Sequence, residues 1–325
     1  MTGKSSTDPI YDTNWPDMPP EIKLKCIRKL KFRDRLSLRC TAKAERSLVD
    51  SQKIDFTKGM FWGTDKFLGL MLYRDNHFDV GKCSADIKEE PFKLMNYIKK
   101  VGVFENLQFT CGSSFTDNQQ FVTDIELFTA RQIEFDVYNN ANVVALLRKM
   151  KDGIESIKID FHIEMEYSLD EILAVSHVQN VPYWHIKDYN ETDSLRKVAQ
   201  MWIDKNSEVG CTFQVSIEEK DGSFEVFLEH FTDRIVSKNE KRVRIHTNHP
   251  DRHILLERGL NDYVEDDDFP QFFRLLVIPT GMKESEYDEN CKEWICKIDP
   301  EYYDDHDSES SFEEHDDEDD DVDFR

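Results

Sequence analysis

The most regular feature of the chain is an alternation of strand-like and helix-like apolar spacing from about residue 100 to residue 280. Apolar and polar residues alternate in short segments, which is typical of half-buried strands. There are seven such segments: residues 107–110, 133–136, 157–160, 184–187, 213–216, 243–246 and 275–278. If Phe109, Phe135, Ile159, Ile186, Val215, Ile245 and Val277 are equivalent, the steps between them are 26, 24, 27, 29, 30 and 32 residues. Each step has the length of one strand and one helix.

The stretches between these segments have helical spacing, with apolar residues three or four positions apart. They contain Phe121, Ile125 and Phe128; Val143, Val144 and Leu147; Ile172, Leu173 and Val175; Leu195, Val198, Trp202 and Ile203; Phe224, Phe227, Leu228 and Phe231; and Ile254, Leu255 and Leu260. A strand and helix pair cannot bury its apolar face alone, so it stacks on its neighbours. We therefore expect a parallel sheet with helices packed behind it.

The near-constant step favours an α/β repeat, a leucine-rich-repeat-like solenoid, although the regular Leu and Asn ladder of such repeats is absent. A doubly wound single sheet is the structural alternative. A last helix around residues 290–298, with Trp294 and Ile295 on its apolar face, would serve as a terminal cap.

The N-terminal part has a different pattern. Apolar residues recur at helical spacing over residues 20–30, and Pro19, Pro20 and Glu21 suit a helix start. Two further short helices are predicted up to about residue 50. Residues 21–46 carry a net charge of +7 in a chain whose net charge is −24. This contrast indicates a separate basic module.

The remaining charge is concentrated at the other end. Residues 299–325 contain fifteen acidic residues and one arginine. With so few apolar residues, this tail is expected to be disordered, as is a flexible lead over residues 1–14. The acidic balance argues against a nucleic-acid partner. No apolar run approaches the length of a membrane span, and the seven scattered cysteines form no C-x-x-C pair, so we expect reduced thiols and a cytoplasmic and/or nuclear protein.

The segment MPPEIKLKCIRKLKFRDRLSLR, residues 18–39, resembles the F-box signature: an apolar residue, Pro, any residue, Glu-Ile, an amphipathic turn and Asp-x-Leu. The resemblance implies short helices whose apolar face is available to a Skp-family adaptor. It also implies which positions build or contact that interface: Met18, Pro19, Glu21, Ile22, Ile27, Leu30 and Leu36. Three residues depart from the family pattern: Lys23 replaces a usual Leu, Thr41 a common Val and Glu45 a common Trp. A plain basic helical cap on the repeat domain is the alternative.

Residues 15–56 as a whole resemble the opening of the large nematode group of F-box proteins, which carry an F-box-associated domain, often of the FTH type. This resemblance implies an F-box over residues 15–52 and an F-box-associated domain over residues 53–298. The implied function is that of a substrate-receptor subunit of a Skp-cullin-F-box ubiquitin ligase, which holds a target protein while ubiquitin is transferred. The alternative is a repeat-domain protein that sequesters a protein or an RNA-associated factor and joins no ligase.

Residues for other chemistry are few. Nucleophile-elbow, Walker and Rossmann glycine motifs are absent, so no catalytic residue and no cofactor is expected. His246, His249 and His253 could be zinc ligands, but no nearby cysteine completes the set, and we expect no metal site. Aromatic residues in the repeat region are mostly core by their spacing. Near one strand, Tyr183, His185 and Tyr189 are candidates for a target-binding surface.

Overall fold

The computed structural model describes residues 14–63, 68–75, 77–84, 89–111, 121, 123–137, 140–161, 168–187, 189, 191–217, 222–259, 271–287 and 291–298. The chain forms two compact units, Met1–Trp184 and His185–Arg325, and each is described separately. The predicted acidic tail lies outside the described residues, as does the predicted lead except for Asn14.

The first unit begins with short helices, as predicted. A 3-10 turn, η1 (Trp15–Asp17), is followed by α1 (Pro20–Lys29), α2 (Phe32–Arg39) and α3 (Lys43–Asp50). Pro20 occupies the first turn of α1, where its missing N–H costs nothing. α3 packs against both α1 and α2, and Ile27, Phe32 and Val49 are fully buried.

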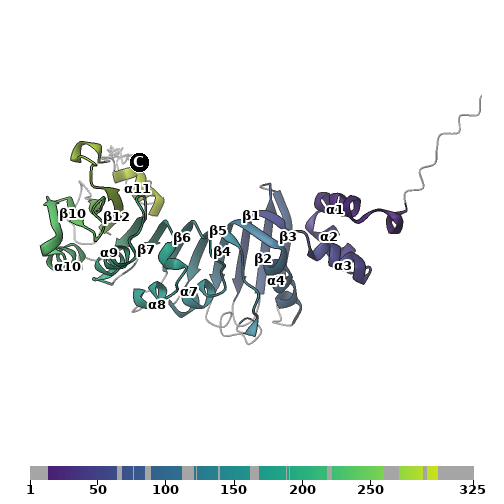
Figure 1. Ribbon diagram of the computed structural model, residues 1–325. Coiled ribbons are helices and arrows are strands. Elements are labelled where there is room, and N and C mark those ends of the chain that lie inside the picture. The colour runs from purple at the N-terminus through teal and green to yellow at the C-terminus, as the bar shows by residue number, and fades with distance from the viewer. Residues whose placement is uncertain are drawn as a thin grey trace, which may run out of the picture. The chain divides into compact units, whose positions relative to one another are not determined.

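A mixed sheet follows these helices, and α2 packs against its edge strand β3. Figure 1 shows α1, α2 and α3 beside that end of the sheet. The strand order within this unit is β3-β2-β1-β4-β5-β6. The strands are β1 (Ile54–Gly63), β2 (Leu68–Arg74), β3 (His77–Ser84), β4 (Gly102–Cys111), β5 (Ala130–Val137) and β6 (Ser156–Phe161). The helices are α4 (Glu89–Val101), α7 (Asn140–Leu147), α8 (Leu169–Leu173) and η2 (Val178–Asn180).

The strands of this sheet pair in two different ways. β1, β2 and β3 form an antiparallel meander, whereas β1, β4, β5 and β6 are parallel and adjacent in chain order. The four parallel strands lie next to one another in chain order, and β2 and β3 lie on the other side of β1. The strands β1 to β3, of which β1 is the first strand of the parallel part, were not predicted.

Aromatic side chains stack across the parallel strands, in place of the Leu and Asn ladder. Phe61 pairs in register with Phe109, Phe109 with Phe135, and Phe135 with Ile159. The ring centroids of Phe61 and Phe109 are 5.6 Å apart, and those of Phe109 and Phe135 are 5.9 Å apart. The predicted equivalence of Phe109, Phe135 and Ile159 is therefore confirmed, and its physical basis is one buried column of rings.

Strand pairing in the second unit is antiparallel, unlike the parallel pairing of β1, β4, β5 and β6 in the first unit. Its strand order is β7-β8-β12-β11-β10-β9, and β8, β12, β11, β10 and β9 pair antiparallel in that order. The strands are β7 (Tyr183–Lys187), which begins at the division between the units, β8 (Thr212–Ile217), β9 (Ile235–Lys238), β10 (Arg242–His246), β11 (Arg252–Gly259) and β12 (Gln271–Pro279). The helices are α9 (Ser194–Lys205), α10 (Ser223–His230), η3 (Thr232–Arg234), η4 (Glu284–Glu286) and α11 (Cys291–Ile298).

Two predictions are wrong in this unit. Ile254 and Leu255 lie on strand β11, not on a helix, and β12 runs antiparallel to β8 instead of continuing a parallel repeat. β11 is buried on both faces, and such a continuous apolar run has no alternation to distinguish a strand from a helix. The last predicted helix is present as α11, and its Trp294 and Ile295 pack on Phe272 of β12.

Candidate functional site

The junction between the short helices and the sheet is built around one buried cation, Arg35 of α2. Its guanidinium donates from Nη2 to the carbonyl of Arg28 at 2.9 Å and from Nε to the carbonyl of Leu30 at 3.3 Å. Nη1 reaches the carbonyl of Lys53, just before β1, at 3.5 Å. Arg28 and Leu30 belong to the end of α1, where backbone carbonyls have no partner within the helix and the helix dipole favours a cation. Arg35 thus joins α1, α2 and the start of the sheet.

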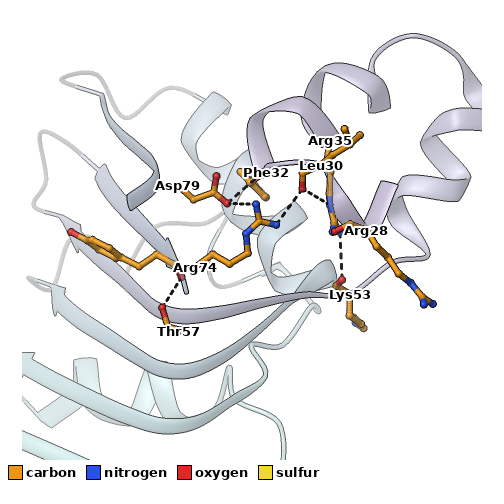
Figure 2. A network of polar contacts seen from close by, with 9 residues as sticks. Arg28, Leu30, Phe32, Arg35, Lys53, Thr57, Arg74 and Asp79 are labelled. Atoms are coloured by element: carbon orange, nitrogen blue, oxygen red, sulfur yellow. Dashed lines mark hydrogen bonds and ion pairs between the residues drawn. The ribbon is translucent and has the colours of Figure 1, made fainter. Parts of the chain in front are cut away.

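A second arginine and a carboxylate complete this junction, which Figure 2 shows from close by. Arg74, at the end of β2, donates from Nη1 to the same Leu30 carbonyl at 3.2 Å and pairs with Asp79 of β3 at 3.4 Å. Asp79 also accepts the backbone N–H of Phe32 at 3.4 Å, at the first residue of α2. Cations therefore meet the end of one helix and an anion meets the start of the next, each with the sign that the helix dipole favours.

Desolvation has a clear effect on Arg35. Burial and the neighbouring Arg74 both lower the pKa of its guanidinium from the ordinary value. Hydrogen bonds to three carbonyls offset the cost of burying this guanidinium. A buried charge without such partners would be far more costly.

Aromatic packing and a further ion pair reinforce the same junction. The ring of Phe32 contacts Phe56 of β1 and Tyr97 of α4, with centroids 5.8 Å and 6.0 Å apart. Arg39 of α2 lies over the ring of Tyr97 and pairs with Asp50 of α3 at 2.6 Å. The helices therefore share their core with the sheet instead of forming a detached module.

Two of the residues that depart from the F-box pattern lie together. Lys23 of α1 and Glu45 of α3 form an ion pair at 3.7 Å, and Glu45 also accepts the indole N–H of Trp15 at 3.1 Å. Lys23 in addition donates to the carbonyl of Pro16 at 3.1 Å. Both charged side chains are only 12% exposed. A polar cluster of Trp15, Lys23 and Glu45 thus stands at the positions where the family pattern has Leu and Trp, and it holds η1 against α1 and α3. Thr41, the third departure, is exposed.

The predicted adaptor-binding residues differ in how exposed they are to solvent. Glu21 and Ile22, on the first turn of α1, and Pro19, just before this helix, are exposed. Ile22 is 43% exposed although it is apolar. Met18 and Leu30 are partly buried. The remaining two have different surroundings.

Ile27 cannot be a contact residue, whereas the prediction for Leu36 stays untested. Ile27 is completely buried, so it builds the helical core and has no surface to offer a partner. Leu36 is half-buried and lines a groove between α2, β3 and α4. Only the first turn of α1 therefore presents the predicted contact residues on an open surface.

The predicted target-binding residues do not form a surface. His185 and Tyr189 are buried, and the Tyr189 hydroxyl donates to Glu191 at 2.5 Å. Tyr183 is partly exposed. The prediction was wrong for His185 and Tyr189 because strand-exit position alone does not reveal that the neighbouring segments cover these side chains.

The three histidines considered as metal ligands have other roles in the second unit. His253 on β11 accepts the Nε–H of Arg244 at its Nδ1 atom, 2.7 Å away, and its ring lies 4.7 Å from that of His246. The His249 Nδ1 atom accepts the backbone N–H of Asp251 at 3.3 Å. Within the part of the chain that the structure describes, no three His, Cys, Asp or Glu side chains are grouped as metal ligands.

Arg244 is the centre of that cluster. Its other nitrogens donate to the carbonyls of Met282 and Thr280 at 2.7 Å and 2.6 Å and to the hydroxyl of Tyr287 at 2.9 Å. Since all these acceptors surround a buried guanidinium, the cluster fastens the segment after β12 to strands β10 and β11.

Comparison with known families agrees with the geometry of the first unit. Residues 15–57 match the sequence model of the F-box domain. The chain therefore carries an F-box domain, made of η1, α1, α2, α3 and the first residues of β1. F-box domains typically bind Skp-family adaptors. Searches of curated proteins and of solved structures gave no match. No helix among the described residues is both long and apolar enough to span a membrane.

The residues of the junction were not recognised in the sequence. Arg35 stands among ten basic residues between positions 21 and 46, so its burial has no sequence signal. Asp79 and Arg74 come from strands that were not predicted. Identifying them would have required a prediction that the F-box packs against a following sheet.

The polar cluster of Trp15, Lys23 and Glu45 gives a stability prediction. We expect Glu45→Ala to lower the free energy of unfolding by about 1–2 kcal/mol, because the indole N–H loses its acceptor. Glu45→Gln keeps an acceptor and loses only the charge, so its cost is expected to stay below about 1 kcal/mol. Denaturant unfolding, with the Trp15 indole proton followed by NMR, measures both. Equal effects of the two variants would contradict the hydrogen bond.

A pH prediction follows from His253. Burial, Arg244 and His246 lower the pKa of this imidazole from 6.5 to about 4. Between these values the unfolded chain binds a proton that the folded chain does not, so the contribution is intact above pH 6.5 and is lost as the pH falls towards 4. We expect hydrogen-exchange protection of β10 and β11 to fall across this window. His253→Gln, which still offers Arg244 an acceptor, should show a smaller fall, and an identical pH profile would refute the assignment.

Proposed function

We propose that this chain is a substrate-receptor subunit of a Skp-cullin-F-box ubiquitin ligase. The F-box would dock a Skp-family adaptor and through it the cullin scaffold, while the region after residue 57 would hold a target protein. The proposal has a non-catalytic role for the chain, in which proximity raises the rate of ubiquitin transfer. Such a complex would operate in the cytoplasm and/or nucleus.

The observation that carries the proposal is the surface on the first turn of α1. Pro19, Glu21 and Ile22 are exposed together, and Ile22 leaves an apolar side chain in water that a partner could cover. The matched F-box domain supplies the partner class. The side chains of Lys23 and Glu45 next to this surface are neutralised by each other, so the departures from the family pattern do not leave bare charges there.

The sheet region supports the receptor role through its attachment. Arg35, Arg74 and Phe32 tie the F-box to β1, β2 and α4 by hydrogen bonds and buried rings. A target bound to this sheet would be held at a fixed geometry relative to the adaptor. Fixed geometry is what proximity catalysis requires.

The region after the F-box is, in this proposal, an F-box-associated domain of the FTH type with a repeat-like arrangement. The resemblance of residues 15–56 to the nematode F-box group supports the type. The parallel strands β1, β4, β5 and β6, adjacent in chain order, support the repeat-like arrangement.

A binding protein that joins no ligase is the second candidate. It is favoured by the departures at Lys23, Thr41 and Glu45, which change the face expected to hold the adaptor. The two functions differ in a single property, which is whether the chain binds a Skp-family adaptor.

Substitution of Ile22 tests the ligase proposal without disturbing the fold. We expect Ile22→Asp to abolish co-purification with a Skp-family adaptor, because a charge would be placed in the interface. Its melting temperature should stay within about 2 °C of the wild type, since the residue is exposed. Ile125→Asp is the matched control, because Ile125 is 89% exposed and lies outside the F-box.

The wild-type chain decides between the two functions. A folded wild-type protein that shows no adaptor binding at micromolar concentration would sink the ligase proposal.

A further inference from the structure

An open groove of about 570 Å³ lies where the F-box meets the sheet. One wall is α2 and the other is formed by β3 and α4. Its apolar lining consists of Leu36 on α2, Val80 on β3, and Leu94 and Tyr97 on α4. Open apolar lining of this kind is typical of a surface that receives a peptide segment.

The charged side chains that the structure describes in the lining of the groove all have one sign. Arg33 and Arg39 come from α2 and Lys93 comes from α4, and no acidic side chain is among the described lining residues. Arg39 is paired with Asp50, whereas Arg33 is exposed at the margin. The positive charge of this described lining is opposite in sign to the net charge of the chain, which is −24. A ligand with carboxylates next to apolar side chains would complement both features.

Tyr97 lines this wall, but its hydroxyl is buried and is not exposed to a ligand in the groove. Burial and the nearby Asp50 raise the pKa of the phenol to about 12, so the group keeps its proton.

From these features we propose that the groove binds an acidic, apolar-anchored segment of the target protein. The inference rests on the proposed function, because it names the chemistry that the receptor recognises. The groove is assigned to the target and not to the adaptor because Val80, Lys93, Leu94 and Tyr97 lie outside residues 15–57, the part that matches the F-box domain. An adaptor common to F-box domains has no reason to depend on them.

Peptide binding to the full chain tests the proposal directly. The probe is a fluorescent synthetic peptide of about 16 residues, with Leu at positions three and four apart and Glu elsewhere. In one control peptide Lys replaces Glu, and in the other Ser replaces Leu. We expect the acidic Leu peptide to bind with a Kd on the order of tens of micromolar by anisotropy, with weaker binding in about 0.5 M salt. Both control peptides should bind at least about tenfold more weakly.

Variants of the groove locate the site. Arg33→Glu and Leu94→Ser should each weaken the acidic peptide by about fivefold or more, since one removes a charge partner and the other an apolar contact. Arg148→Glu is the matched control, because Arg148 is also exposed and lies outside the groove. Arg33 is exposed, so Arg33→Glu keeps the test valid even if Leu94→Ser disturbs the fold.

The outcomes separate this inference from the proposed function. No binding of the acidic peptide, equal binding of the Lys peptide, or no effect of Arg33→Glu would overturn the groove assignment. If Arg33→Glu loses adaptor binding together with the peptide, the groove belongs to the adaptor interface and the assignment to the target is wrong. If Arg33→Glu loses the peptide and keeps the adaptor, both the groove and the ligase function are supported. If the wild type binds the peptide but no adaptor, the ligase function fails and the groove remains a peptide site.

Discussion

The buried guanidinium of Arg35 is the interaction on which the F-box end of this protein depends. Three short helices of eight to ten residues cannot enclose a core of their own. A permanent cation placed among them would be prohibitively costly if it were left without acceptors. Arg35 has acceptors only because α1 ends at Leu30 and the chain passes Lys53 on its way into β1. Carbonyl groups at the end of α1 and just before β1 therefore together accept the hydrogen bonds of one guanidinium.

The other contacts of the junction follow from this arrangement. Arg74 uses the same Leu30 carbonyl from the side of the sheet, and Asp79 takes the first amide of α2. That amide belongs to Phe32, whose ring packs against Phe56 and Tyr97. β3 and α4 supply the second wall of the groove, and its described lining has basic and apolar residues. In the proposed function, the contacts that attach the F-box to the sheet therefore also form the binding site for the target.

Much of the fold was predictable wherever spacing carried the information. The strands at Phe109, Phe135 and Ile159 were placed in the correct register because a single column of buried rings imposes a constant step. Strand β11 was predicted as a helix because Ile254 and Leu255 belong to a run that is buried on both faces, where alternation disappears. The antiparallel second unit was missed for a related reason, since strand spacing does not reveal strand direction.

The candidate site was predictable only in part. The exposed turn at Pro19, Glu21 and Ile22 follows from the F-box signature, which fixes residue types at local spacing. The burial of Ile27 and Tyr189 depends on segments packed over them, and the pairing of Lys23 with Glu45 joins two helices that are distant in sequence. Arg35 is the clearest case of a residue that could not be predicted, because no local sequence feature distinguishes the one buried arginine from the many exposed basic residues around it.

The account makes the F-box and the first strands one cooperative structure, and native-state hydrogen exchange tests this most directly. Backbone amides of α2 and of the paired strands β1 and β4 should open with the same free energy, within about 0.5 kcal/mol, and with the same denaturant dependence. Exchange of α2 through a lower-energy opening that leaves β1 and β4 protected would contradict the account, because the helices would then unfold while the sheet that is said to complete them stayed intact.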